Sequence, residues 1–168
     1  FTFIVGADPH TEDFEDAFIE AGCDDATFIL RRGALAVSFD RDGETYKDAV
    51  LSAYKDIKKA GSEIIRFEPD FLVSVPEIAE RANLSRAAVD NYAKGQRRDG
   101  FPLPDARFNA KSPLWDWVEV SGWLCERNML DVSEYRHALV SRVINLGVQL
   151  HQMDASVDFD IEKKLQHV

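Results

Sequence analysis

Apolar residues recur with two different spacings over the first seventy positions. Short runs in which they alternate with small or polar residues predict strands, and stretches in which they return every three or four positions predict helices. In chain order the expected elements are a strand at 1–7, a helix at 11–22, strands at 26–32 and 33–43, a helix at 44–61 and a strand at 62–70. We expect Thr11 and Thr45 to cap the helices. The order βαββαβ predicts a ferredoxin-like sandwich for residues 1–70, and the chain as a whole is expected to be α+β.

The pattern becomes helical at the start of the next segment, residues 71–127. Ser74 and Glu77 have the spacing of a capping box, in which each side chain bonds to the backbone of the other. Asn83 suits a tight turn because it tolerates the left-handed conformation. Ser85 is expected to cap a second helix that runs from 86 to 94. Two short helices around such a turn predict a helix-turn-helix, although a plain structural hairpin has the same pattern.

The residues that follow are rich in Arg, Lys, Gly and Pro. The stretch QRRDGFPLPDARFNAKSPLWDW, residues 96–117, predicts a short β-hairpin that projects basic side chains. A third helix is expected after it, with Asp116 as its cap and Glu119 three residues on.

Three sequence stretches together resemble a known family of DNA-binding domains. VSVPEIAERANLSRAAVDNY, then FPLP, then LWDWVEVSGWL is similar to the winged helix-turn-helix of the MerR, AlpA and excisionase type. The resemblance implies that the second helix enters the major groove and that the wing follows the DNA backbone. Asp90 and Asp99 depart from the family pattern, because their carboxylates repel phosphate. The whole chain also resembles a bacterial group of small regulators in which an acidic domain precedes such a motif.

The net charge of -10 has the wrong sign for a partner of DNA, but it is unevenly spread along the chain. Residues 1–72 hold 16 acidic and 8 basic side chains, whereas residues 81–111 hold 7 basic and 3 acidic ones. At physiological salt a charge is felt only within roughly 8–10 Å, so the local excess decides which surface attracts a polyanion. We therefore expect the contacts with double-stranded DNA to lie within residues 81–111.

The candidate DNA-binding residues divide into two groups by position. Those of the second helix, expected in the groove, are Ser85, Arg86, Ala87, Asn91 and Lys94. Those of the wing, expected on the phosphates, are Arg97, Arg98, Arg107 and Lys111. Arg86 is the preferred candidate for reading a base, because the first turn of a recognition helix faces the base edges.

The last segment, residues 128–168, is expected to hold a long amphipathic helix at 132–152 and a polar tail. Asp131 or Ser133 is suited to cap it. Its apolar positions return every three or four residues, and a helix of this kind after a winged motif is often a dimerisation element, as in MerR-type proteins. We expect a homodimer with Leu139, Val143 and Leu146 at the centre of its interface. The alternative is that the helix packs against its own chain.

Other chemistry finds little support in the sequence. The two cysteines lie about a hundred residues apart, and the four histidines have no metal-ligand spacing, so no metal or cofactor is expected. No phosphate-binding glycine loop occurs, the AGCDDA stretch lacks a partner histidine, and we expect no enzymatic activity. No apolar run is long enough to cross a membrane. The first residue is Phe1, so the natural start is expected upstream, and the expected location is the cytoplasm, at the nucleoid.

Three functions remain open on these observations. The first is a sequence-specific DNA-binding transcriptional regulator, expected to be a dimeric repressor that also controls its own gene. The second is an excisionase-like architectural protein that bends DNA. The third is an antitoxin-like interaction module with autoregulatory DNA binding. In each case the acidic N-terminal domain leaves room for a protein partner or a small ligand.

Overall fold

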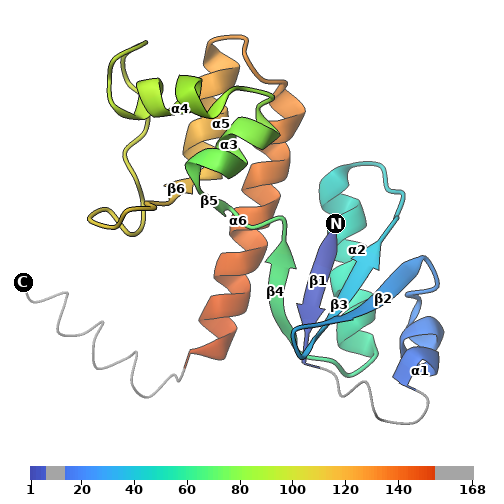
Figure 1. Ribbon diagram of the computed structural model, residues 1–168. Coiled ribbons are helices and arrows are strands. Elements are labelled where there is room, and N and C mark those ends of the chain that lie inside the picture. Colours follow the sequence, from blue (N-terminus) through green and yellow to red (C-terminus); the bar gives the residue numbers. More distant parts are fainter. Residues whose placement is uncertain (7–13, 154–168) are drawn as a thin grey trace, which may run out of the picture.

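The computed structural model describes residues 1–6 and 14–153, in which a four-stranded sheet lies beside a mainly helical unit and one long helix runs along both (Figure 1). The elements are β1 (Thr2–Val5), α1 (Phe14–Ala21), β2 (Ala26–Arg31), β3 (Ala34–Phe39), α2 (Tyr46–Lys59), β4 (Ile64–Glu68), β5 (Leu72–Val73), α3 (Val75–Arg81), α4 (Arg86–Ala93), β6 (Trp115–Asp116), α5 (Trp117–Glu126) and α6 (Val132–Gln152). The expected α+β class is confirmed.

The strands of the larger sheet have the order β2-β3-β1-β4, and all neighbours are antiparallel. Phe3 in the central strand β1 lies between Val37 of β3 and Phe67 of β4. These three side chains are fully buried, together with Val50 and Ile57 of α2. The predicted order of strands and helices up to residue 70 is confirmed, and so is the Thr45 cap, whose side chain accepts from the N–H of Asp48. The predicted cap Thr11 lies outside the described residues.

An arginine holds together the loops at one end of this sheet. The guanidinium of Arg41, which is only 10% exposed, forms ion pairs with Asp25 and Asp56 at 2.7 and 2.5 Å. It also donates to the carbonyl oxygen of Gly22 at 2.6 Å. The hydrogen bonds from Arg41 hold the pKa of Asp25 below its ordinary value. Arg41 thereby joins the end of α1, the start of β2 and the last turn of α2.

The second hydrophobic core is formed by α3, α4, α5 and the short β5–β6 pair. Its largest buried side chains are Trp115, Trp117 and Trp123. The local predictions hold here: the Ser74–Glu77 capping box is present, and the turn residue Asn83 has φ of 52°. Their agreement follows from the short range of capping and turn interactions, which depend on residues only a few positions apart.

The β-hairpin predicted for residues 96–117 is wrong in most of its length. A single bridge pairs Ala106 with Leu114, and β6 pairs with β5 instead of with a wing strand. The segment contains prolines at 102, 104 and 113, which lack the N–H that a regular strand pair needs. Tryptophan side chains hold it instead: the Trp115 indole donates to Pro102 O at 3.1 Å and the Trp123 indole to Asp99 O at 3.3 Å.

The predicted long helix is confirmed as α6, and Asp131 is its cap. One face of α6 packs against both cores, with Ala138 buried in the second core and Val148 buried in the first. The alternative that this helix packs against its own chain is therefore correct for that face. Arg142 adds an ion pair to Asp116 at 2.8 Å, and Asp116 in turn caps α5.

Asn145 is the most specific contact between α6 and the sheet. Its Oδ1 accepts from the N–H of Phe67 at 2.8 Å, and its Nδ2 donates to the Phe67 carbonyl at 2.9 Å. Phe67 lies in the edge strand β4, so the amide satisfies backbone groups that a further strand would otherwise have paired. Asn145 is 2% exposed, which means that water cannot replace it.

We expect the substitution Asn145→Leu to lower the free energy of unfolding by about 2–4 kcal/mol, because two buried backbone groups then lose their partners. Denaturant unfolding followed by tryptophan fluorescence and circular dichroism measures the loss. The matched control is Gln149→Leu, an exposed position one turn further along the same helix. A loss no larger than that of the control would contradict the role given to Asn145.

Candidate nucleic-acid interface

Helices α3 and α4 meet through the four residues between Arg81 and Arg86. Ile78 and Ala79 of α3 and Val89 and Tyr92 of α4 are buried where the helices meet the second core. The Ser85 hydroxyl accepts from the N–H of Ala88 at 3.1 Å and so begins α4. This packing leaves the opposite face of α4 in solvent.

The predicted residues of α4 lie mostly on that solvent face. Arg86, Ala87 and Lys94 are exposed, as is the cap Ser85, whereas Asn91 is half-buried. Lys94 is the C-terminal cap of α4 instead of its last residue, because the chain turns at Gly95 with φ of 65°. The five candidates are therefore accessible to a ligand in different degrees, with Asn91 the least accessible.

A groove of about 760 Å³ lies between α4 and the irregular segment at 96–114, which is called the wing segment from here on. Three predicted basic residues line it: Lys94 from α4, and Arg107 and Lys111 from the wing. The remaining lining residues are Ser74, Val75, Pro76, Glu77, Asp90, Ala93, Leu103, Pro104, Phe108, Ser112, Pro113, Leu114 and Trp115. The fold thus brings basic side chains that lie up to seventeen residues apart in the sequence to the lining of one groove.

Two carboxylates line the same groove and reduce its positive potential. Burial raises the pKa of Glu77, but hydrogen bonds from Ser74 and the charge of Arg81 outweigh it, and the net result is a pKa below the ordinary value. Glu77 therefore remains an anion at neutral pH, held by the Ser74 N–H at 2.7 Å. Asp90, which the sequence marks as a departure from the resembled family, is the second acidic residue of the groove.

Arg86 lies apart from this groove, beside the start of α4. It lines a separate shallow hollow together with Pro76, Glu77, Ala79, Glu80, Asn83 and Leu84. The side chain is exposed, and among the described residues no ion pair involves it. Its guanidinium is consequently accessible at the first turn of α4.

Arg97 and Arg98 belong to the turn that follows α4, and both are exposed. Arg98 has φ of 59°, and its Nη1 lies 2.7 Å from the sulfur of Met129 in the connection between α5 and α6. That contact directs Arg98 away from the groove residues. Arg81, which contributes to the local positive excess in the sequence, packs inward: it donates to Asp70 O at 2.9 Å and lies 5.6 Å from the Trp117 ring.

Two exposed apolar side chains of the wing were not predicted as part of the site. Phe108, 66% exposed, follows Arg107 directly and lines the groove, and Leu103 is 79% exposed. An aromatic residue inside a basic, proline-rich segment was the available sequence signal. Leu103 and Phe108 therefore add apolar surface to the lining of the groove.

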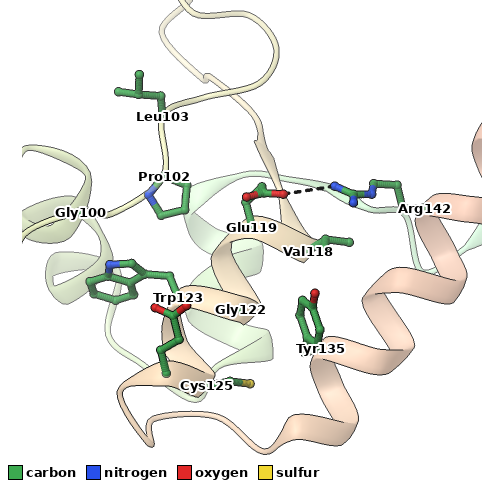
Figure 2. A pocket seen from close by; sticks show the side chains of 11 residues that line it. Gly100, Pro102, Leu103, Val118, Glu119, Gly122, Trp123, Cys125, Tyr135 and Arg142 are labelled. Carbon is green, nitrogen blue, oxygen red and sulfur yellow. Dashed lines mark hydrogen bonds and ion pairs between the residues drawn. The ribbon is translucent and has the colours of Figure 1, made fainter.

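A second cleft, of about 790 Å³, lies between the start of the wing, α5 and α6 (Figure 2). Glu119 and Arg142 form an ion pair at its edge at 3.4 Å, and Tyr135 and Cys125 line its base. Burial raises the pKa of the Cys125 thiol, which makes it a poor nucleophile at neutral pH. The charges here do not resemble those of the groove on α4, and no predicted DNA-binding residue lines this cleft.

Residues 1–6 and 14–153 contain neither a metal-binding cluster nor a membrane-spanning helix. No group of three or more His, Cys, Asp or Glu side chains there is arranged to hold a metal ion. Burial raises the pKa of the Cys23 thiol to about 11, as do the nearby carboxylates. No helix of this part of the chain combines the length and the apolar character needed to cross a membrane.

Comparison with protein-family models, with curated proteins and with solved structures finds no match to this chain. The functional assignment therefore rests on the arrangement of α3, α4, the wing segment and their charges.

Proposed function

We propose that this chain is a sequence-specific DNA-binding regulator of transcription, acting as a repressor that also controls its own gene. The observation that carries the proposal is the gathering of Lys94, Arg107 and Lys111 around one groove beside the exposed face of α4. Lysine and arginine side chains attract phosphate, and a helix beside such a groove has the dimensions that a major groove admits. The acidic total charge does not oppose this, since most acidic residues lie in the sheet unit.

The proposed fold of residues 71–127 is a winged helix-turn-helix. Support comes from the two short helices, from the left-handed turn at Asn83 and from the Ser85 cap of α4. In this proposal the irregular segment from 96 to 114 corresponds to the wing. Its anchoring by Trp115 and Trp123 supports a wing that holds Arg107 and Lys111 in place without a regular hairpin.

The position of each side chain determines whether we propose that it contacts a base or a phosphate. Arg86, at the accessible first turn of α4, reads a base edge, because an arginine fork pairs with the two acceptors of guanine. Lys94, Arg107 and Lys111 contact phosphates and position the helix. Arg97 adds charge at the rim, whereas Arg98 contributes less because its guanidinium contacts Met129.

For residues 1–70 we propose a ferredoxin-like sandwich that receives a regulatory signal. The antiparallel order β2-β3-β1-β4 and the two helices packed on one face support this fold. The sheet and α4 lie on opposite sides of the molecule in Figure 1, which keeps the acidic unit away from DNA. A protein partner or a small ligand at this unit reaches the DNA-binding helices through α6, which packs against both cores.

The outward face of α6 supports a proposed homodimer. Val143 and Leu146 are 66% and 50% exposed, and Leu150, 71% exposed, continues the same stripe, so that the spacings are three and then four residues. That is the repeat of a two-stranded coiled coil. Leu139 is half-buried against the second core, so it lies at the margin of the proposed interface and not at its centre.

We expect the triple substitution Lys94→Ala, Arg107→Ala, Lys111→Ala to weaken binding to a random-sequence duplex at least tenfold. The slope of log affinity against log salt should flatten by roughly 0.9 for each lost phosphate contact. Fluorescence anisotropy over a series of salt concentrations measures both quantities.

The matched control removes the same charge from the other unit by Lys47→Ala, Lys55→Ala, Lys58→Ala, three exposed residues of α2. The control should retain the affinity and slope of the unmodified chain. Equal affinities for both triple variants would remove the groove from the interface and the DNA-binding function with it.

The substitution Arg86→Ala should relax the preference for one base position without unfolding the domain. An arginine–guanine pair contributes about 1–3 kcal/mol of discrimination, which selection from a random duplex library detects as a lost consensus position. Arg97→Ala, which removes a charge outside α4, serves as the control and should leave the consensus intact. If the Arg86 variant returned the original consensus, Arg86 would contact only phosphate.

The double substitution Val143→Asp, Leu146→Asp should abolish the association that depends on α6, because it places two charges in the middle of the apolar stripe. Light scattering at micromolar concentration measures the mass, and thermal unfolding checks that the exposed positions leave the fold intact. Gln149→Asp, an exposed charge change on the same helix, is the control. An unchanged mass for the double variant would exclude this face as an interface.

A further inference from the structure

The two outer strands of the four-stranded sheet differ in what covers them. The free edge of β4 is covered by α6, through Asn145 and through Gln152, whose Nε2 lies 3.4 Å from the Ile64 carbonyl. The free edge of β2 pairs with no strand or helix in the described part of the chain. Two apolar residues of β2 are also exposed, Ile29 by 45% and Leu30 by 57%.

The turn between β2 and β3 determines which backbone groups point outward. Arg32 and Gly33 form a two-residue loop in which both φ angles are positive, at 56° and 77°, and such a loop makes Arg31 and Ala34 a hydrogen-bonded pair. Along an antiparallel ladder, hydrogen-bonded pairs alternate with pairs that are not bonded. Ile29 and Ala36 are therefore a bonded pair. The N–H and C=O groups of Phe28 and Leu30 point away from β3, to the open edge.

An independent contact agrees with this alternation. The N–H of Asp40 donates to the carbonyl of Asp25 at 3.3 Å, which makes residue 25 a bonded position like 29 and 31. Phe28 lies three residues from both Asp25 and Arg31, an odd number, so its N–H and C=O point away from β3. The edge therefore offers donors and acceptors on alternate residues, as a partner strand requires.

We propose that β2 pairs with β2 of a second copy, antiparallel and about a two-fold axis at Phe28, so that the two sheets join into one. In this register Phe28 exchanges both backbone hydrogen bonds with Phe28 of the second copy. The N–H of Leu30 donates to the carbonyl of Ala26 across the axis. The Ala26 N–H already donates to Cys23 O at 3.1 Å and is not needed.

The charges around β2 select this partner and this register. The stretch reads DDATFILRR from 24 to 32, with two acids before the strand and two arginines after it. A two-fold axis at Phe28 brings the turn residues Asp24 and Asp25, which precede β2, to the end of the second copy's β2 that carries Arg31 and the turn residue Arg32. Asp24, Arg31 and Arg32 are exposed, and the ion pairs among the described residues do not include them. Opposite charges brought together at both ends of the interface attract each other.

The apolar residues fit the same arrangement. Leu30 then lies opposite Ala26 and beside Phe28, and Ile29 lies opposite Thr27, so both exposed side chains gain a small neighbour across the axis. Proteins usually block an open edge with a lysine, a proline or a bulge in the strand. Between Ala26 and Leu30 there is none of these, and the pairing with β3 is regular throughout.

This contact is separate from the stripe on α6, so each can be tested in the absence of the other. With both contacts present, the intact chain associates beyond a dimer. In the Val143→Asp, Leu146→Asp background we expect the mass to fall to that of a dimer, twice the monomer mass of 19.0 kDa. Sedimentation over a range of concentrations gives the dissociation constant. A monomer in that background at all concentrations would overturn the proposal, whatever the result for DNA binding.

Leu30→Pro in the same background should convert the dimer to a monomer. The Leu30 N–H points away from β3, so proline removes no bond within the chain and removes the donor that faces the second copy. Thermal unfolding checks the fold. A folded Leu30→Pro chain that remains dimeric would overturn the proposal.

A charge exchange tests the register even if the proline variant fails to fold. Arg32→Asp alone and Asp24→Arg alone should each raise the dimer dissociation constant roughly tenfold, because by the two-fold symmetry each replaces attraction by repulsion at both ends of the interface. Aspartate tolerates the positive φ of position 32, so the turn should survive. The double variant Asp24→Arg, Arg32→Asp should recover the original constant. Single variants without effect, or a double variant no better than the singles, would overturn the pairing.

Discussion

The two hydrogen bonds between the Asn145 side chain and the Phe67 backbone are the contact on which the position of α6 against the sheet depends. It lies between α6 and the edge strand of the sheet, and it is buried. A buried peptide group without a partner costs about 1–3 kcal/mol. A shift or rotation of α6 that moves Asn145 away from Phe67 would therefore destabilise the fold. Because Ala138 and Arg142 of the same helix contact the second core and the α5 cap, the position of α6 also orients the second core relative to the sheet.

The proposed site depends on a different kind of constraint. Tryptophan indoles and the Arg127 guanidinium, which lies 4.1 Å from the Trp123 ring, bind the carbonyl groups at the start of the wing. These bonds replace the strand ladder that the prolines prevent. They leave Arg107, Phe108 and Lys111 exposed on an irregular segment beside α4. This segment therefore combines anchored ends with exposed side chains between them.

The acidic and basic side chains are distributed unequally between the sheet unit and the helical unit, so the net charge of the chain does not describe either one. The sheet unit holds most acidic side chains, and part of them serves the structure, as Asp25 and Asp56 do through Arg41. The groove on α4 mixes three cations with Glu77 and Asp90, so its positive potential is moderate. For the proposed DNA-binding function this favours association of chains, since two weak sites on one DNA give the discrimination that one lacks. The exposed stripe of α6 and the open edge of β2 are the two surfaces suited to that association.

Elements whose ends depend on neighbouring residues were predictable from the sequence. The Ser74–Glu77 box, the Asn83 turn, and the limits of α4 and α6 all follow from interactions over three or four positions. The amphipathic pattern of α6 showed that the helix would form, but not which of its faces would be covered. Asn145 reads as an ordinary polar residue until β4 is placed beside it, 78 positions earlier in the chain.

Local chemistry thus determined the elements, their caps and the clustering of basic residues between 81 and 111. Tertiary structure alone decided that Arg81 and Arg98 turn away from the groove while Lys94, Arg107 and Lys111 meet there. It also decided that the wing has no regular hairpin and that one sheet edge is covered and the other open. The physical reason is the range of the interactions: caps and turns act within one helical turn, whereas burial, indole bonds and strand edges depend on residues brought together only when the chain folds.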